Sequence, residues 1–328
     1  SLRDVLSYAI GYARRGVHYV PRVVATLNTV RPLFESEWQT SAALWLRNGG
    51  PEAGKLWSNP VLADTWEKLL REAEAAGTDR IAQIVGSADR SAADRVNDQR
   101  RKPDQMLAFI GLRPGMTALD LSAGGGYTTE LLARAVGPNG RAFGQSQPPR
   151  AVDAPPRPPV APEGNASPQL PAPPMASPAV RRTSAQALAE RAKNPAVANL
   201  SAVVRTFEDP VPPELAGGLD LVTLMFNYHD LGHMGVDRVR MNAAVFAGLK
   251  PGGLYVLADH AGRPGTGISE AGTLHRIEED FLRKEIEAAG FRLQARGDFL
   301  RNPADPRDKN TPEPAQPKDE FVLKFVKP

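Results

Sequence analysis

The sequence predicts an α/β fold with a mainly parallel, seven-stranded sheet covered by helices on both faces, plus an N-terminal helical segment. Three observations indicate this architecture. From about residue 88 onward, short apolar runs alternate with stretches of helical periodicity. A glycine-rich turn at residues 124–126 joins one apolar run to a helix. Residues 1–87 show helical periodicity, and 328 residues accommodate one domain of ordinary size plus a smaller segment.

The second part of the chain, residues 88–328, supplies the elements of the sheet. The expected strands are residues 117–121, 141–145, 202–205, 219–226, 254–259, 291–300 and 320–326. Residues 92–105 are expected to form one basic, polar helix before the first strand, and residues 128–136 and 183–194 form helices between strands. Strands that alternate with helices favour a mainly parallel sheet.

Residues 147–182 are dense in proline and alanine and contain almost no large apolar side chain. Such a segment cannot bury enough surface to offset the entropy lost on ordering. We expect a disordered or polyproline-like insertion on the surface of the α/β domain.

The N-terminal segment, residues 1–87, is predicted to form short helices divided by Pro21, Pro32, Pro51 and Pro60. Residues 8–18 and 58–69 resemble an internal, non-catalytic part of the large subunit of bacterial gamma-glutamyltranspeptidases. That family's threonine nucleophile and arginine motif have no counterpart here. We therefore expect no transpeptidase activity.

Composition excludes several classes of function. The net charge of +3 is a small excess spread along the chain, so we predict no nucleic-acid binding. The apolar runs are strand-sized, so we predict no membrane span. The absence of cysteine excludes disulfides, thiolate nucleophiles and Cys-ligated zinc. A cytoplasmic location is the default, and a periplasmic one stays open because the chain starts at Ser1 and a removed leader could have preceded it.

The glycine-rich turn carries the strongest functional signal. An apolar strand ends at Asp120, Gly124 and Gly126 lie in the turn, and a helix closed by Gly137 follows. The amide donors at the start of a helix suit a ligand carboxylate, and Asp120 suits an ammonium group.

This turn resembles motif I of class I methyltransferases, although Ser122 stands where that motif usually has its first glycine. The resemblance implies a Rossmann-like fold and S-adenosyl-L-methionine as cofactor. The residues that it assigns to the cofactor are Asp120, Ser122, Ala123, Gly124, Gly126 and Tyr127.

A dinucleotide site is the competing interpretation, because glycine-rich turns between a strand and a helix also bind NAD. Three features oppose it. Thr129 stands where a third glycine would fall, and the second strand ends in residues 144–147 without an acid for the ribose. In addition, residues 249–253 resemble the turn before the fifth strand of methyltransferases.

Methyltransferases also commonly place an acid after the second strand, so the absence of this acid counts against the methyltransferase interpretation as well. We expect the amide of Gln145 to replace it, with a weaker bond to the ribose. Glu208 and Asp209, just past the third strand, are expected near the adenine amino group, and Asn227 is assigned to the cofactor as well.

Histidine–aspartate pairs follow the fourth and fifth strands. His229 and Asp230 follow one, and Asp259 and His260 end the other. Ligands bind beyond the carboxyl ends of parallel strands, so we expect both pairs at the acceptor side. His229 or His260 serves there as a general base or positions the acceptor. No tight metal-ligand spacing appears, so we predict no metal site.

Residues 101–112, 227–230, 259–262 and 273–277, with the C-terminal strand, resemble a branch of predicted bacterial methyltransferases. This resemblance covers about residue 89 to the end, without the proline-rich insertion. Residues 273–277 are expected to open a helix over 276–289, which puts His275 beside the pocket.

We predict a methyltransferase acting on an unidentified small molecule. The alternatives are a non-catalytic scaffold that binds the cofactor or a partner and, third, an NAD-dependent oxidoreductase. The oligomeric state is not predicted.

Overall fold

The computed structural model describes residues 2–46, 49–149, 182–312 and 316–328. The chain divides into two compact units, Ser1–Arg80 and Ile81–Pro328, whereas the sequence predicted the boundary at residues 87/88. Most of the predicted proline-rich insertion lies outside the described residues. No helix in the described part is long and apolar enough to span a membrane.

The first unit is mainly helical. Its helices are α1 (Leu2–Arg15), α2 (Pro21–Ser36), α3 (Gln39–Trp45) and the first part of α4 (Pro60–Gly86). Two features were not predicted. Strands β1 (Val17–His18) and β2 (Leu56–Trp57) form a short antiparallel pair. Pro32 lies inside α2, which continues past it with Phe34 buried, so proline does not end the helix there.

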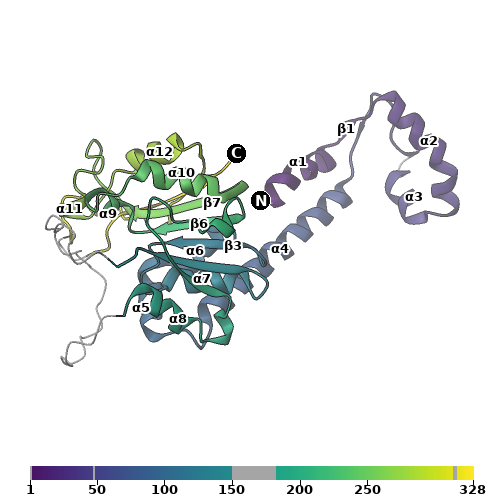
Figure 1. Ribbon diagram of the computed structural model, residues 1–328. Coiled ribbons are helices and arrows are strands. Elements are labelled where there is room, and N and C mark those ends of the chain that lie inside the picture. The colour runs from purple at the N-terminus through teal and green to yellow at the C-terminus, as the bar shows by residue number, and fades with distance from the viewer. Residues whose placement is uncertain (1, 47–48, 150–181, 313–315) are drawn as a thin grey trace. The chain divides into compact units, whose positions relative to one another are not determined.

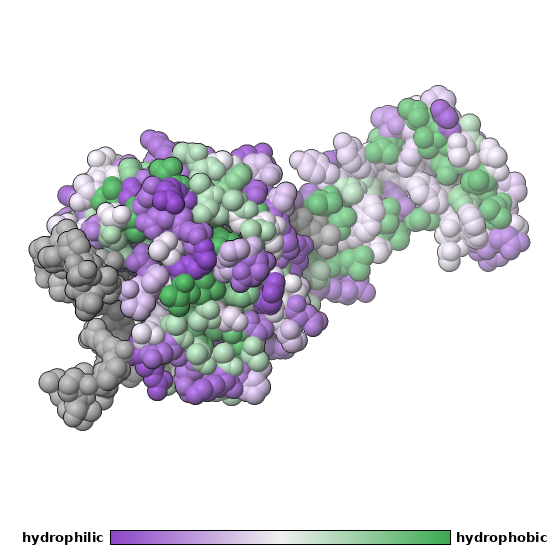
Figure 2. Space-filling model, in the orientation of Figure 1, coloured by the Kyte–Doolittle hydropathy of each residue, from purple (hydrophilic) through white to green (hydrophobic). Residues whose placement is uncertain are grey.

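The core of the first unit is small, with Ile10, Ala63 and Leu70 as its buried members. Ten of the twelve large hydrophobic side chains that are exposed among the described residues belong to this unit. Figure 2 shows hydrophobic residues at the surface of its helices. The unit therefore buries little of its apolar surface by itself.

The second unit contains the predicted seven-stranded sheet (Figure 1). Its strands are β3 (Thr117–Leu121), β4 (Arg141–Ser146), β5 (Leu200–Val204), β6 (Leu219–Met225), β7 (Leu249–His260), β8 (Arg292–Gly297) and β9 (Glu320–Val326). The order is β5-β4-β3-β6-β7-β9-β8. All neighbours pair in parallel except β9, which is antiparallel to both β7 and β8. The predicted fold class is confirmed.

Alternate side chains of the central strands enter two separate cores, as the period of two requires. Leu119 and Leu257 contact the first core, and Ala118 and Val256 contact the second. Helices α10 (Arg238–Gly248) and α12 (Glu279–Ala288) cover the first face. Helices α6 (Pro103–Ile110), α7 (Tyr127–Val136) and α8 (Ser184–Arg191) cover the second. The sheet is thus buried on both sides, which parallel strands need.

Two predicted helices are wrong in their bounds. The helix expected over 92–105 is two helices, α5 (Ala92–Arg101) and α6, because Lys102 has a left-handed φ of 43° and Pro103 starts the next helix. The helix expected from residue 276 begins at Glu279. His275, with φ 50°, instead ends the short helix α11 (Ala271–Leu274), and Ile277 bridges to Ala261.

The position of the unit boundary can be tested by truncation. Ile81, Ile84 and Val85 pack against the second core, so removing them should cost roughly 2–4 kcal/mol of unfolding free energy. We expect a fragment of residues 81–328 to unfold cooperatively in urea, and a fragment of residues 88–328 to be less stable by that amount. Equal stability of the two fragments would contradict the boundary at residue 80.

Candidate functional site

The candidate site lies at the carboxyl ends of β3, β4 and β6, where the strand order reverses direction. The chain runs from β3 through β4 to β5 on one side and continues with β6 and β7 on the other. Such a reversal leaves a crevice between the loops that follow the strands. A pocket of about 420 Å³ occupies this position, lined by Ser122, Gly124, Ser146, Gln147, Pro148, Ser184, Phe207, Asn227 and Met234.

The glycine-rich turn forms one wall of the pocket. Gly124 has φ 53°, and a Cβ placed on it would meet no protein atom closer than 4.0 Å. A ligand can therefore approach its backbone closely. Gly126, with φ 84°, precedes helix α7, and a Cβ there would lie 2.8 Å from Leu188. Gly126 is thus needed for helix packing, whereas Gly124 leaves space on the pocket side.

Ser122 has the left-handed φ of 55° that glycine adopts without strain. Two hydrogen bonds hold it in this conformation. Its backbone N–H donates to Oε1 of Gln145 at 3.0 Å, and its Oγ donates to Oδ1 of Asn227 at 2.6 Å. The serine that departs from the usual motif is therefore a structural link between the turn and the loop after β6.

Gln145 is fully buried, and both polar atoms of its side chain bond to the protein. Its Oε1 accepts from Ser122, and its Nε2 donates to the carbonyl oxygen of Arg205 at 2.7 Å. The geometry disfavours the predicted contact of Gln145 with the ribose. Ser146 and Gln147, the next two residues, line the pocket instead.

Helix α8 supports the glycine-rich turn through two side chains. Ser184 Oγ donates to the carbonyl oxygen of Gly124, and Arg191 Nε donates to that of Gly125, both at 2.6 Å. Arg191 also pairs with Asp94 of α5 and Glu130 of α7. With both carbonyls held in this way, the turn is fixed before any ligand arrives. No sequence signal marked Arg191, because its partners are 61 to 97 residues away.

Asp120 lies behind the turn, 2% exposed. Its two carboxylate oxygens accept hydrogen bonds from Thr129 Oγ1 at 2.7 Å and Thr223 Oγ1 at 2.8 Å. Burial raises the pKa of Asp120 to about 6, although both hydroxyls favour the ionised form. These contacts favour a positioning role over the predicted one of holding the ligand's ammonium group.

The other predicted cofactor residues divide into two groups. Asn227 lines the pocket as expected. Four others do not line the pocket and contact other parts of the protein instead. Ala123 packs beneath Gly144, and the hydroxyl of Tyr127 donates to Asp98 at 2.7 Å. Glu208 accepts from the backbone N–H of Asp237, and Asp209 pairs with Arg205. Phe207, the residue before Glu208, lines the pocket and was missed because it resembled an ordinary core residue.

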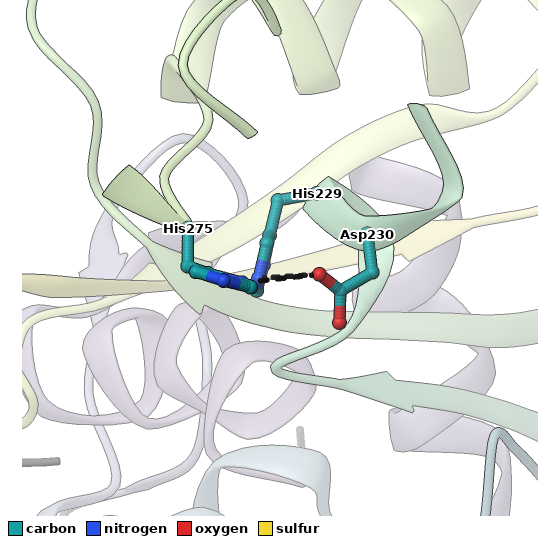
Figure 3. Close-up of side chains that lie close together, drawn as sticks. All are labelled: His229, Asp230 and His275. Atoms are coloured by element: carbon teal, nitrogen blue, oxygen red, sulfur yellow. Dashed lines mark hydrogen bonds and ion pairs between the residues drawn. The ribbon is translucent and has the colours of Figure 1, made fainter. Parts of the chain in front are cut away.

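The predicted histidine–aspartate cluster does come together, beyond the ends of β6 and β7. His229 is fully buried, with its backbone N–H and its Nδ1 bonded to the two oxygens of Asp259 at 2.9 and 2.6 Å. Its Nε2 lies 3.2 Å from Asp230 Oδ1, and Nδ1 of His275 lies 3.2 Å from the same oxygen (Figure 3). Asp230 Oδ2 accepts from Asn227 at 2.6 Å, which connects the cluster to the pocket.

His260 lies beside this cluster, with its ring 5.4 Å from that of His229. Its Nδ1 is 3.0 Å from Glu320, which also pairs with Arg100 at 2.7 Å. Burial lowers the pKa of His229, but Asp259 and Asp230 outweigh this and raise it to about 10. Both ring nitrogens of His229 already face carboxylates, so of the two predicted roles for His229 the geometry favours positioning.

The structural role of Gln145 predicts a specific loss of stability. In Gln145→Leu the N–H of Ser122 and the carbonyl of Arg205 lose their partners, so we expect a loss of about 2–4 kcal/mol in urea unfolding. Gln147→Leu, two residues on and partly exposed, is the matched control and should change stability by less than about 0.5 kcal/mol. Similar losses for both variants would exclude the bridging role.

The raised pKa of Asp120 predicts a pH dependence. Between about pH 4 and 6 the folded state holds a proton that the unfolded state releases, so this group lowers stability as pH rises. Relative to Asp120→Asn, the wild-type chain should lose roughly 2–3 kcal/mol between pH 4 and pH 7. Urea unfolding at several pH values measures the difference, with the exposed Asp104→Asn as control. A constant or opposite difference would refute the assignment.

Comparisons with known proteins concern the fold. No family model and no curated protein match the sequence. The chain is similar to a SAM-dependent methyltransferase from Aquifex aeolicus, with 15% identity over 73% of this chain and 100% of that one, and a TM-score of 0.45. It is also similar to the putative methyltransferase in a complex with the Haloferax volcanii Trm112 methyltransferase activator, with 18% identity over 76% and 97% of the chains, and a TM-score of 0.45. Neither these structures nor the other comparisons support the gamma-glutamyltranspeptidase resemblance or the particular bacterial branch.

Proposed function

We propose that this protein is an S-adenosylmethionine-dependent methyltransferase acting on a small-molecule acceptor. The observation that carries the proposal is the pocket at the reversal point of the sheet, bounded by the glycine-rich turn that resembles motif I. In open α/β sheets this is the place where nucleotide-like ligands bind. The pocket volume of about 420 Å³ suits a ligand of that size.

The residues around the pocket offer the kinds of contact that the cofactor needs. Gly124 leaves its backbone open, and the N-terminus of α7 presents amide donors suited to a carboxylate. Ser146 and Gln147 offer polar groups for ribose hydroxyls, in place of the predicted Gln145. Phe207 offers an aromatic face for a base.

The acceptor side of the site is formed by the His–Asp cluster next to Asn227. Bound S-adenosylmethionine supplies an activated methyl group on a sulfonium, so the protein's main task is to align an acceptor with it. Asn227 is held from both sides, by Ser122 Oγ and by Asp230 Oδ2, which fixes its position at the pocket wall. His260 and the Asp230 carboxylate are the groups we assign to orienting the acceptor.

The sheet topology opposes the NAD-dependent alternative. When the seven strands of this sheet are numbered from 1 to 7 in chain order, their order across the sheet is 3-2-1-4-5-7-6, and strand 7 is antiparallel to both of its neighbours. Dinucleotide-binding domains typically have the order 3-2-1-4-5-6. A scaffold that binds the cofactor differs from the proposal only in catalysis, so a turnover measurement separates them, and a scaffold that binds only a partner is separated by cofactor binding.

Calorimetry on the full chain tests the cofactor, with S-adenosylmethionine, S-adenosylhomocysteine and NAD as ligands. We expect both adenosyl compounds to bind and NAD not to bind. Gly124→Ala puts a methyl group at the pocket wall and, because Gly124 has φ 53°, also strains the turn, so it should weaken binding about tenfold or more. Gly125→Ala is the matched control, because Gly125 has no positive φ and does not line the pocket.

The control variant should bind within about twofold of the wild-type chain, a difference of about 0.4 kcal/mol, because a Cβ on Gly125 would meet no other atom within 4 Å. Absence of binding by both adenosyl compounds would refute the methyltransferase proposal. Equal weakening by the two alanine variants would refute the placement of the cofactor at Gly124. Binding without methyl transfer to any compound of a broad acceptor panel would favour the scaffold alternative.

A further inference from the structure

We propose that His229, Asp230 and His275 form a binding site for a divalent transition-metal ion. The three ligand atoms are Nε2 of His229, an oxygen of Asp230 and a ring nitrogen of His275, and all lie within 4.8 Å of one another. They come from two segments of the chain, helix α9 (Tyr228–His233) and the end of α11, more than 40 residues apart (Figure 3). This separation explains why the sequence showed no metal-ligand spacing.

The two distances from Asp230 to the histidines fit a shared ion. Asp230 Oδ1 lies 3.2 Å from His229 Nε2 and 3.2 Å from His275 Nδ1. With metal–ligand bonds of about 2.1 Å, neighbouring ligand atoms in a tetrahedral or octahedral shell lie roughly 3.0–3.4 Å apart. Nε2 of His233 is 3.6 Å from the same Asp230 oxygen and can supply a fourth ligand after a small movement.

His229 has the features of a metal ligand that is held ready. Its side chain is fully buried, and its Nε2 forms an ion pair with Asp230 Oδ1 at 3.2 Å, so a metal ion bound there would replace the proton between these two atoms. The opposite ring nitrogen, Nδ1, is bonded at 2.6 Å to the buried Asp259. A carboxylate on the second nitrogen is the usual support of a histidine that binds a metal.

The charges and the ligand types indicate which ions fit. Asp230 and Asp259 supply two negative charges at the cluster, which balance a divalent cation. Glu320, which lies 3.0 Å from His260, is already paired with Arg100. Two imidazoles and one carboxylate favour Zn²⁺, Co²⁺, Ni²⁺ or Fe²⁺ over Mg²⁺ or Ca²⁺.

An ion here would lie next to the pocket, because Asp230 is bonded to Asn227 and Asn227 lines the pocket wall. It could then act as a Lewis acid on a hydroxyl or thiol of the acceptor. This consequence rests on the proposed function, whereas the metal site itself does not.

The test is direct metal binding by the full chain, produced without a histidine tag and stripped with a chelator. After addition of Zn²⁺ or Co²⁺ and removal of excess ion, elemental analysis should find one equivalent. The Co²⁺ form should show visible absorption bands that Zn²⁺ displaces. We expect His275→Gln and Asp230→Asn to weaken binding at least about tenfold, and Asp259→Asn to weaken it about 10- to 100-fold.

His18→Gln is the matched control, because His18 belongs to the first unit and is the one histidine outside residues 229–275. It should bind like the wild-type chain.

Circular dichroism of each variant excludes misfolding, and Asp230→Asn keeps the shape of the side chain. The absence of stoichiometric metal, or full binding by both His275→Gln and Asp230→Asn, would overturn the proposal. The cluster would then be an ion-pair network alone. S-adenosylmethionine binding is measured without metal, so the two proposals fail separately.

Discussion

The amide of Gln145 fixes the relative positions of three strand ends, and the rest of the site depends on it. Its side-chain oxygen accepts from Ser122 after β3, its nitrogen donates to Arg205 after β5, and its own carbonyl accepts from Ala123. All of this occurs in a fully buried position, where each unmade bond would cost about 1–3 kcal/mol. A carboxylate could accept from Ser122 but could not donate to Arg205, so an amide suits this position better than an acid does.

The two departures from the expected motif therefore belong together. Ser122 adopts a left-handed φ that costs a non-glycine residue on the order of 1 kcal/mol. Gln145 on its N–H and Asn227 on its hydroxyl offset that cost. In return, Ser122 connects the glycine-rich turn to the loop that carries Asp230. A glycine at position 122 would relieve the strain and remove this connection.

The sequence was sufficient to predict the sheet, but it was insufficient to predict the contacts that shape the site. Strands β3 and β9 agree with their predicted bounds because apolar runs of that length have no other stable arrangement in a two-faced sheet. The helix break at Lys102 and the turn at His275 depend on left-handed conformations of ordinary residues, which periodicity does not reveal. Arg191, Phe207 and the partners of Asp120 acquire their roles only through tertiary contacts.

The site contains two different electrostatic environments, and hydrogen bonds from Ser122 through Asn227 to Asp230 connect them. Around Ser122, Gln145 and Asp120 the side-chain hydrogen-bond partners are neutral amides and hydroxyls, and the buried Asp120 has a raised pKa. Beyond Asn227 the environment changes, because imidazoles surround Asp230 and the pKa of its carboxyl is lowered despite partial burial. Asn227 is the junction, since it accepts from Ser122 and donates to Asp230. The proposed cofactor site and the proposed acceptor or metal site would thus lie on the two sides of one amide side chain, that of Asn227.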